Sequence, residues 1–146
     1  MARQTLVVDA SVGVKWFSAV GEAHVPQARA ILLDCAFGGI NVIVPELFFH
    51  EIANALVHKA VISDGQLAEA VTTLCSLDLV LFATNGERLR TAAQLARKAR
   101  ITEYDAYYAV AAIENGCPLV TANPRHQRQD LGCQVIPIEK WQAGAG

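Results

Sequence analysis

The sequence predicts an α/β protein: a three-layer α/β/α sandwich built on a mostly parallel sheet of about five short strands. Short β-branched apolar runs alternate with amphipathic stretches of helical length along the chain. Most of these runs lack a regular polar alternation, which is typical of parallel strands covered by helices on both faces. The length of 146 residues suits one core, so we expect residues 1–146 to form a single domain.

Five segments are the candidate strands, each short and bounded by turn residues. They are Thr5–Val8, Asn41–Val44, Leu79–Phe82, Pro118–Thr121 and Gln134–Ile136. In parallel sheets the ligand site lies outside the carboxyl ends of the strands. Residues that follow these strands are therefore the first place to look for chemistry.

The stretches between the strands carry helix boundary signals. The predicted helices span Val25–Phe37, Pro45–Lys59, Ser63 to about Ser76, Glu87–Arg100 and Thr102–Asn115, and a further helix begins near Ser11. Pro45 stands at a first-turn position, and Ser63 with Gln66 has the spacing of a capping box. Gly38 and Gly116 follow two of the helices, as residues that end helices commonly do.

The composition restricts the class of function. Hydrophobic residues make up 53% of the chain and charged residues only 18%, so a disordered chain is excluded. The apolar surplus, with a mean hydropathy of +0.28, indicates buried strands and an apolar face for a partner. The formal net charge of −2 lacks the global signature of a nucleic-acid binder. Binding to nucleic acid would therefore need a local basic patch or a metal ion.

The cellular context expected from the sequence is the cytoplasm, with no membrane contact. No apolar run approaches the roughly 20 residues that cross a bilayer, and Asp9 and Lys15 interrupt the only early apolar segment, so no signal peptide is expected. Four cysteines lack CxxC spacing and lie in apolar neighbourhoods, which favours buried reduced thiols over disulfides. They are Cys35, Cys75, Cys117 and Cys133.

Two acidic residues occupy positions that a solvated face does not explain. Asp9 ends the first predicted strand, where it is either a site residue or the N-cap of the following helix. Glu51 lies three residues after Phe48 and four before Ala55 on the apolar stripe of its helix. A buried carboxylate in that position needs a cation or a hydrogen-bonding partner.

Asp105 repeats this pattern in the first turn of the last predicted helix. The apolar stripe that includes Tyr108 and Ala112 lies three and seven residues after it, which places Asp105 at the inner corner of the helix. The alternative is a capping box from Thr102 to Asp105, although aspartate is shorter than the usual partner.

Three acids at core-facing or strand-end positions predict a divalent metal site. Gathered together, Asp9, Glu51 and Asp105 would repel one another unless a cation neutralised them. Oxygen ligands favour Mg²⁺ or Mn²⁺ over zinc. The zinc-protease pattern HExxH begins at His50 but has Asn54 in place of its second histidine, so we reject it.

Four motifs, taken in order, resemble the PIN-domain family, and in particular toxins of the VapC type. The motifs are VVDASV, VPELFFHEIANAL, ITEYDAYYAVAA and PLVTAN, and the resemblance runs from Thr5 to about Ile138. It implies a compact PIN-like α/β/α fold, an Mg²⁺- or Mn²⁺-dependent endoribonuclease acting on RNA, a homodimer, and a cognate antitoxin that binds across the active site. The family's catalytic and metal-binding acids then fall on Asp9, Glu51 and Asp105. Ser11 and Thr121 fall on its supporting hydroxyl residues.

The last motif departs from the family pattern because Asn123 stands where an aspartate is common. An amide oxygen can bind Mg²⁺ but brings no charge, so a second metal would bind weakly there. The alternative is that Asn123, followed by Pro124, caps a helix. Asp130 could approach the site if the segment between is helical.

Basic and aromatic residues near these motifs are candidates for binding partners. Arg125, His126 and Arg128 follow Asn123 and are candidate contacts to RNA phosphates. For Arg97, Lys98 and Arg100, a helix C-terminal cluster is the favoured interpretation. Trp16, Phe17, Phe48 and Phe49 are candidates for the partner surface, although core packing is the commoner place for aromatic residues.

Three other interpretations compete with this one. The chain could be a catalytically weakened PIN-like module that binds RNA, for which Asn123 is the best support, or a solitary PIN nuclease without an antitoxin. A phospho-acceptor receiver domain is disfavoured, because Asp9 stands alone after its strand and no lysine follows Thr121 closely.

Overall fold

Five parallel strands form one sheet in the spatial order β3-β2-β1-β4-β5. The structure is a computed structural model and describes residues 2–123 and 131–142. Its strands are β1 (Gln4–Val8), β2 (Ile40–Pro45), β3 (Val80–Phe82), β4 (Leu119–Thr121) and β5 (Val135–Pro137). The five predicted strands are confirmed, each with small shifts at its ends.

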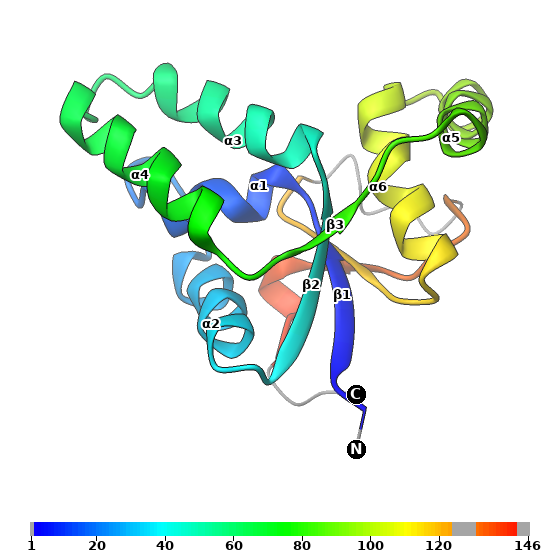
Figure 1. Cartoon of the computed structure of the whole chain (residues 1–146), viewed down its shortest axis with the longest axis horizontal. Coiled ribbons are helices and arrows are strands. Elements are labelled where there is room, and N and C mark those ends of the chain that lie inside the picture. The colour runs from blue at the N-terminus through cyan, green and yellow to red at the C-terminus, as the bar shows by residue number, and fades with distance from the viewer. Residues whose placement is uncertain (1, 124–130, 143–146) are drawn as a thin grey trace.

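Helices cover both faces of this sheet (Figure 1). The first group is α1 (Ala10–Gly13) with the short 3₁₀ helix η1 (Val14–Trp16), α2 (Val25–Ala36), α3 (Leu47–Val57) and α4 (Asp64–Ser76). The second group is α5 (Gly86–Ala99) and α6 (Glu103–Glu114), and a 3₁₀ turn, η4 (Ile138–Lys140), follows β5. The two groups lie on opposite sides of the strands, which confirms the predicted three-layer α/β/α sandwich.

The strand order creates a switch point between β1 and β4. The chain first moves outward from β1 to β2 and β3, and it then returns to place β4 on the other side of β1. Right-handed crossovers place the helices of these two movements on opposite faces. The adjacent crossovers therefore diverge beyond the carboxyl ends of β1 and β4, where open α/β sheets bind ligands.

Local sequence signals account for several helix ends. The capping box is present, because Ser63 Oγ accepts a hydrogen bond from Gln66 N at 3.2 Å and Gln66 Oε1 accepts one from Ser63 N at 2.9 Å. The prediction for Pro45 is wrong: it is the last residue of β2, paired with Phe82, and α3 begins two residues later. A proline at a strand end costs little, since no further ladder bond is required of its nitrogen.

The structure decides between the two alternatives that the sequence left open for Trp16 and Phe48, a partner surface or the core, in favour of the core. Phe48 is 0% exposed and Trp16 only 7%, and their rings meet edge to face with centroids 5.8 Å apart. The indole N–H of Trp16 donates to the carbonyl of Ala28 at 2.8 Å, which fixes it against α2. Phe17 and Phe49 are half-buried and stay available at the edge of this cluster.

The four cysteines, all within the described residues, are free thiols as predicted, but they are not all buried. Cys75 is exposed and the other three are half-buried. Burial raises the pKa of Cys133 to about 11 and also raises that of Cys117, so both thiols are protonated at neutral pH. No helix in the described part of the chain has the length and apolar character needed to cross a membrane.

Candidate active site

A small cavity of about 120 Å³ lies beyond the carboxyl ends of β1 and β4. It is lined by Asp9, Ala10, Ser11, Glu51, Asp105, Tyr108 and Asn123, and we call it the acidic cavity. Asp9 follows β1, Asn123 follows β4, Glu51 belongs to α3 and Asp105 to α6. The four residues singled out as metal ligands thus come together from both helical layers and from two neighbouring strands.

Two larger cavities within the described residues have different linings. One of about 320 Å³ lies beside Arg88 on α5 and contains two carboxylates, Glu87 and Glu114, but Arg88 is a cation in the same cavity and holds Glu114 in an ion pair. Another, of about 300 Å³, is lined mainly by apolar residues such as Phe17 and Ile62. The chemistry of the lining residues, rather than volume, therefore identifies the acidic cavity as the candidate site.

Asp9 caps a helix and lines the acidic cavity at the same time. Its Oδ1 accepts hydrogen bonds from the backbone N–H of Ser11 at 3.1 Å and from the Ser11 hydroxyl. Its Oδ2 accepts one from the Thr121 hydroxyl at 2.5 Å. Only 2% of Asp9 is exposed. The two interpretations that the sequence left open for Asp9 are therefore compatible.

Ser11 and Thr121 occupy equivalent positions around that carboxylate. The Ser11 hydroxyl accepts from Ala122 N at 2.9 Å, and the Thr121 hydroxyl accepts from Asn123 N at 3.0 Å. Because each hydroxyl has a single proton, accepting from a backbone N–H leaves that proton to be donated to Asp9. The two hydroxyls hold the carboxylate in one orientation and tie the end of β4 to the end of β1.

Glu51 reaches the acidic cavity from α3 and has a buried partner on α6. The phenol of Tyr108 donates to Glu51 Oε1 at 2.7 Å, and Tyr108 is 1% exposed. Burial raises the pKa of Tyr108 far above its ordinary value, and the nearby charges of Glu51 and Asp9 raise it further. The phenol therefore remains a proton donor at any physiological pH.

Tyr108 is the site residue that sequence reasoning missed. It lies on the apolar stripe of its helix, where an aromatic residue is expected to pack in the core. The available signal was its spacing: it stands one helical turn after Asp105 and so shares the face of α6 that the acid occupies.

Asp105 and Asn123 complete the lining of the cavity. Thr102 caps α6 through the backbone N–H of Asp105, which donates to its hydroxyl at 3.1 Å, while Asp105 itself is half-buried against the cavity. Asn123 lines the cavity directly after β4. The alternative role of Asn123 as a helix cap concerns the segment that follows, which lies outside the described residues.

The close approach of α1 to α3 helps to assemble the site. Gly13 lies on α1, and a Cβ built there would stand only 2.5 Å from Ile52 Cδ1 and 2.7 Å from Phe48 Cζ. The absence of a side chain at Gly13 lets α1 pack directly on α3. This packing brings the residues after β1 toward Glu51.

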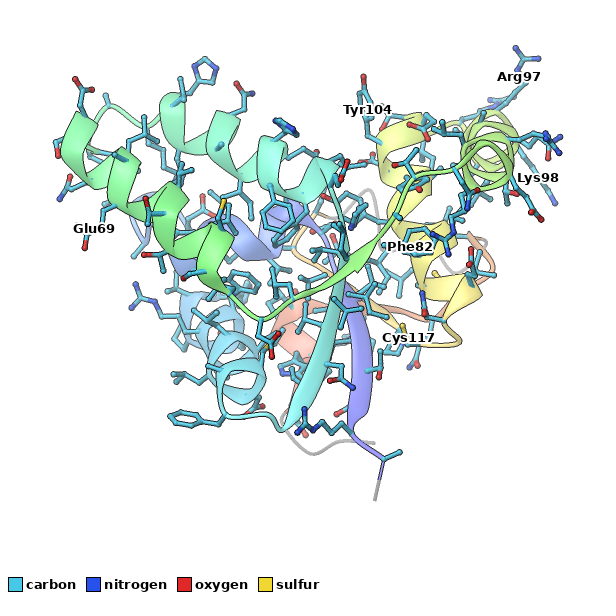
Figure 2. All side chains as sticks on the ribbon, in the orientation of Figure 1. Glu69, Phe82, Arg97, Lys98, Tyr104 and Cys117 are labelled. Carbon is cyan, nitrogen blue, oxygen red and sulfur yellow. The ribbon has the colours of Figure 1, made fainter. Side chains whose placement is uncertain are left out.

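The basic candidates for RNA contact, and the acid Asp130, are not part of the described site. Arg125, His126, Arg128 and Asp130 lie outside the described residues, and their predicted roles stay predictions. Arg97 and Lys98 belong to the last turn of α5, and Figure 2 shows both side chains directed outward from that helix. A helix C-terminal cluster is the interpretation that this placement favours.

The residues that line the acidic cavity suit a hard divalent cation. Three carboxylates and an amide are oxygen donors of the kind that Mg²⁺ and Mn²⁺ prefer. Within residues 2–123 and 131–142, no three Asp, Glu, His or Cys side chains stand close enough to hold one ion together. Mg²⁺ is usually held by one or two carboxylates plus water, so this arrangement agrees with binding that is partly water-mediated.

An acidic cavity at the switch point of a parallel α/β/α sheet defines the class: an α/β protein with an oxygen-ligand site at its strand ends. The family follows from sequence comparison. The PIN domain family matches residues 6–131, and the chain belongs to it. No curated protein matches the sequence.

Several solved structures share the fold at low sequence identity. PAE2754 from Pyrobaculum aerophilum is 20% identical, with a TM-score of 0.62 over 95% of this chain and 93% of that one. A chain of VapBC2 from Rickettsia felis, bound to a DNA fragment from its promoter, is 13% identical, with a TM-score of 0.68 over 92% and 98%. VapC20 of Mycobacterium tuberculosis, a toxin that cleaves the sarcin-ricin loop, is 14% identical, with a TM-score of 0.63 over 86% and 92%.

Proposed function

We propose that the protein is a divalent-metal-dependent endoribonuclease and the toxin of a toxin–antitoxin pair. The observation that carries this proposal is the meeting of Asp9, Glu51, Asp105 and Asn123 in one cavity at the switch point of the sheet. Membership of the PIN domain family supports it. The similar fold of the sarcin-ricin loop-cleaving toxin agrees with RNA as the substrate class.

The roles proposed for the residues follow from their contacts. Asp9, Glu51 and Asp105 hold an Mg²⁺ or Mn²⁺ ion, directly or through water, and Ser11 and Thr121 keep Asp9 oriented. A divalent ion held there would supply polarisation of the phosphodiester and activation of the attacking water. Asn123 contributes an uncharged ligand, so a second ion would bind weakly.

Metal-dependent cleavage of RNA tests this proposal directly. The purified chain is incubated with a structured RNA and Mg²⁺ or Mn²⁺, and with EDTA as the metal-free reference. We expect cleavage that EDTA abolishes and that Asp9→Asn and Asp105→Asn each reduce by at least about 100-fold. Asp64→Asn is the matched control, because Asp64 is exposed on the first turn of α4 and away from the cavity. Cleavage that survives Asp9→Asn would contradict the assignment.

A cognate antitoxin and a second copy of the chain are the proposed protein partners. The chains of similar fold include one in a structure of VapBC2. The apolar cavity lined by Phe17, Val20, Val61 and Ile62 is a suitable surface for an apolar partner segment, and Val20 and Val61 are each 62% exposed. A small open reading frame directly upstream, encoding a DNA-binding N-terminus and a disordered tail, would support the antitoxin.

We also propose a cytoplasmic location and a single functional domain over residues 1–146.

Asn123 favours a second candidate function, a weakened PIN-like module that binds RNA without cutting it. With no charge at this position, the cavity has one carboxylate fewer than the family pattern provides. RNA binding in Mn²⁺ without cleavage, in a protein whose Asp9→Asn variant binds RNA equally well, would support this candidate over the nuclease. Cleavage without any antitoxin partner would instead indicate a solitary nuclease.

A further inference from the structure

We propose that Tyr108 is the positioning residue of the acidic cavity: its phenol holds the Glu51 carboxylate in place by a hydrogen bond from the opposite helical layer. The inference rests on the proposed function only in that Glu51 is taken as a metal ligand. The hydrogen bond between the two residues is direct, at 2.7 Å from Tyr108 Oη to Glu51 Oε1.

A long carboxylate side chain such as that of Glu51 gains from a hydrogen bond that holds it in one position. A glutamate side chain has three rotatable bonds and loses much conformational freedom when it is held in one position. Asp9 is shorter and is held by two hydroxyls and a backbone N–H. For Glu51, which is half-buried on α3, the Tyr108 phenol is a donor from another element that fixes one of its two oxygens.

Tyr108 is itself held firmly enough to act as a positioning group. It is 1% exposed within α6 and lies one turn after Asp105 on the same helix face. A carboxylate can only accept, so the single proton of the Tyr108 phenol is donated to Glu51.

The position of this bond in the fold explains its effect. The helix that bears Glu51 covers one face of the sheet and the helix that bears Tyr108 covers the other (Figure 1). Since Asp105 shares α6 with Tyr108, this hydrogen bond links the acids of the two layers directly. Partners of metal ligands orient those ligands, and removing one typically lowers metal affinity about 10–100-fold.

Tyr108→Phe removes the hydroxyl and keeps the packed ring, and the chain offers a matched control in Tyr107→Phe. Tyr107 is the next residue along the chain, is 2% exposed, and donates its own hydrogen bond at 3.1 Å to the carbonyl of Ala83, outside the acidic cavity. Both substitutions delete one phenol hydrogen bond from the buried part of α6. They differ in whether the lost bond ends on Glu51.

The experiment measures Mn²⁺ affinity by isothermal titration calorimetry without RNA, with urea unfolding of the metal-free proteins beside it. We expect Tyr108→Phe to weaken Mn²⁺ binding about tenfold and Tyr107→Phe to leave it unchanged, at similar losses of stability. In a Glu51→Ala background, which removes both the ligand and the acceptor, Tyr108→Phe should cause no further loss, because the phenol acts through Glu51. Equal Mn²⁺ affinity in wild type and Tyr108→Phe, or a full additional loss in the Glu51→Ala background, would overturn the inference.

The outcomes also separate this inference from the proposed function. Mn²⁺ binding that depends on both Asp9 and Tyr108, in a protein that cleaves no RNA, would support the positioning role and refute the nuclease. Metal-dependent cleavage with an unaffected Tyr108→Phe variant would do the reverse. A wild-type protein that binds no Mn²⁺ would refute both.

Discussion

Replacing Thr121 with valine removes the hydroxyl that joins the end of β4 to the carboxylate after β1. The hydroxyl donates to Asp9 Oδ2 at 2.5 Å and accepts from Asn123 N at 3.0 Å, and Thr121 is 0% exposed. Valine keeps the β-branched shape and favours strands at least as well as threonine does. The change in stability therefore reports chiefly on the two hydrogen bonds.

The expected size of this change follows from those two contacts. A hydrogen bond to a charged group contributes about 1.5–3 kcal/mol, and the N–H of the half-buried Asn123 can turn to water at a smaller cost. We expect Thr121→Val to lower the free energy of unfolding by about 3 kcal/mol. With an m-value of about 2 kcal/mol/M, the urea midpoint then falls by about 1.5 M.

The assay is urea unfolding followed by circular dichroism at pH 7, with Thr121→Ser as the control. Serine keeps the hydroxyl and loses one buried methyl group, which costs about 1 kcal/mol. We therefore expect the serine variant to be more stable than the valine variant, although valine is the more apolar residue. A valine variant as stable as the serine variant or the wild type would refute the assigned role of the hydroxyl.

Three further predictions follow from other contacts. Burial raises the pKa of Glu22, but hydrogen bonds and charges from Lys15 and Lys59 bring it below the usual value. Glu22→Gln should therefore lower the free energy of unfolding by about 2 kcal/mol at pH 7, and in urea unfolding this loss should vanish as the pH falls through the lowered pKa. A loss that does not depend on pH would argue against the ion pairs. Gly13→Ala should destabilise the fold by about 1–3 kcal/mol in thermal unfolding, because its Cβ would stand 2.5 Å from Ile52 Cδ1; an unchanged midpoint would mean that α1 can move away. Asn123→Asp should tighten Mn²⁺ binding on the order of tenfold in calorimetry by adding a charge to the cavity, and equal affinity would identify the residue as a cap only.

Much of the site could be predicted because helical and strand periodicity reveal which face of an element a residue occupies. Glu51 and Asp105 interrupt apolar stripes, and an acid in such a position must reach a cavity or a partner. Both residues do line the acidic cavity. Asp9 follows a strand end, where the topology of parallel sheets places ligand sites.

Periodicity alone did not settle what some residues of a buried face contact. The sequence left Trp16 and Phe48 open between a partner surface and the core, and they pack against each other in the core. Tyr108 looked like a core residue, and its ring is buried, but its hydroxyl is within hydrogen-bonding distance of Glu51. The apolar pattern of one helix indicates which way its side chains point. It does not indicate which residue of a neighbouring element lies opposite them.

The sequence by itself determined the alternation of strands and helices, the parallel character of the sheet and the identity of the acids, because these depend on local propensity and spacing. Only the tertiary structure decided the order β3-β2-β1-β4-β5, and with it which residues meet. The bonds from Thr121 to Asp9 and from Tyr108 to Glu51 join residues 112 and 57 positions apart. Such pairs depend on the tertiary arrangement of the elements, since no local pattern records which distant element will lie opposite.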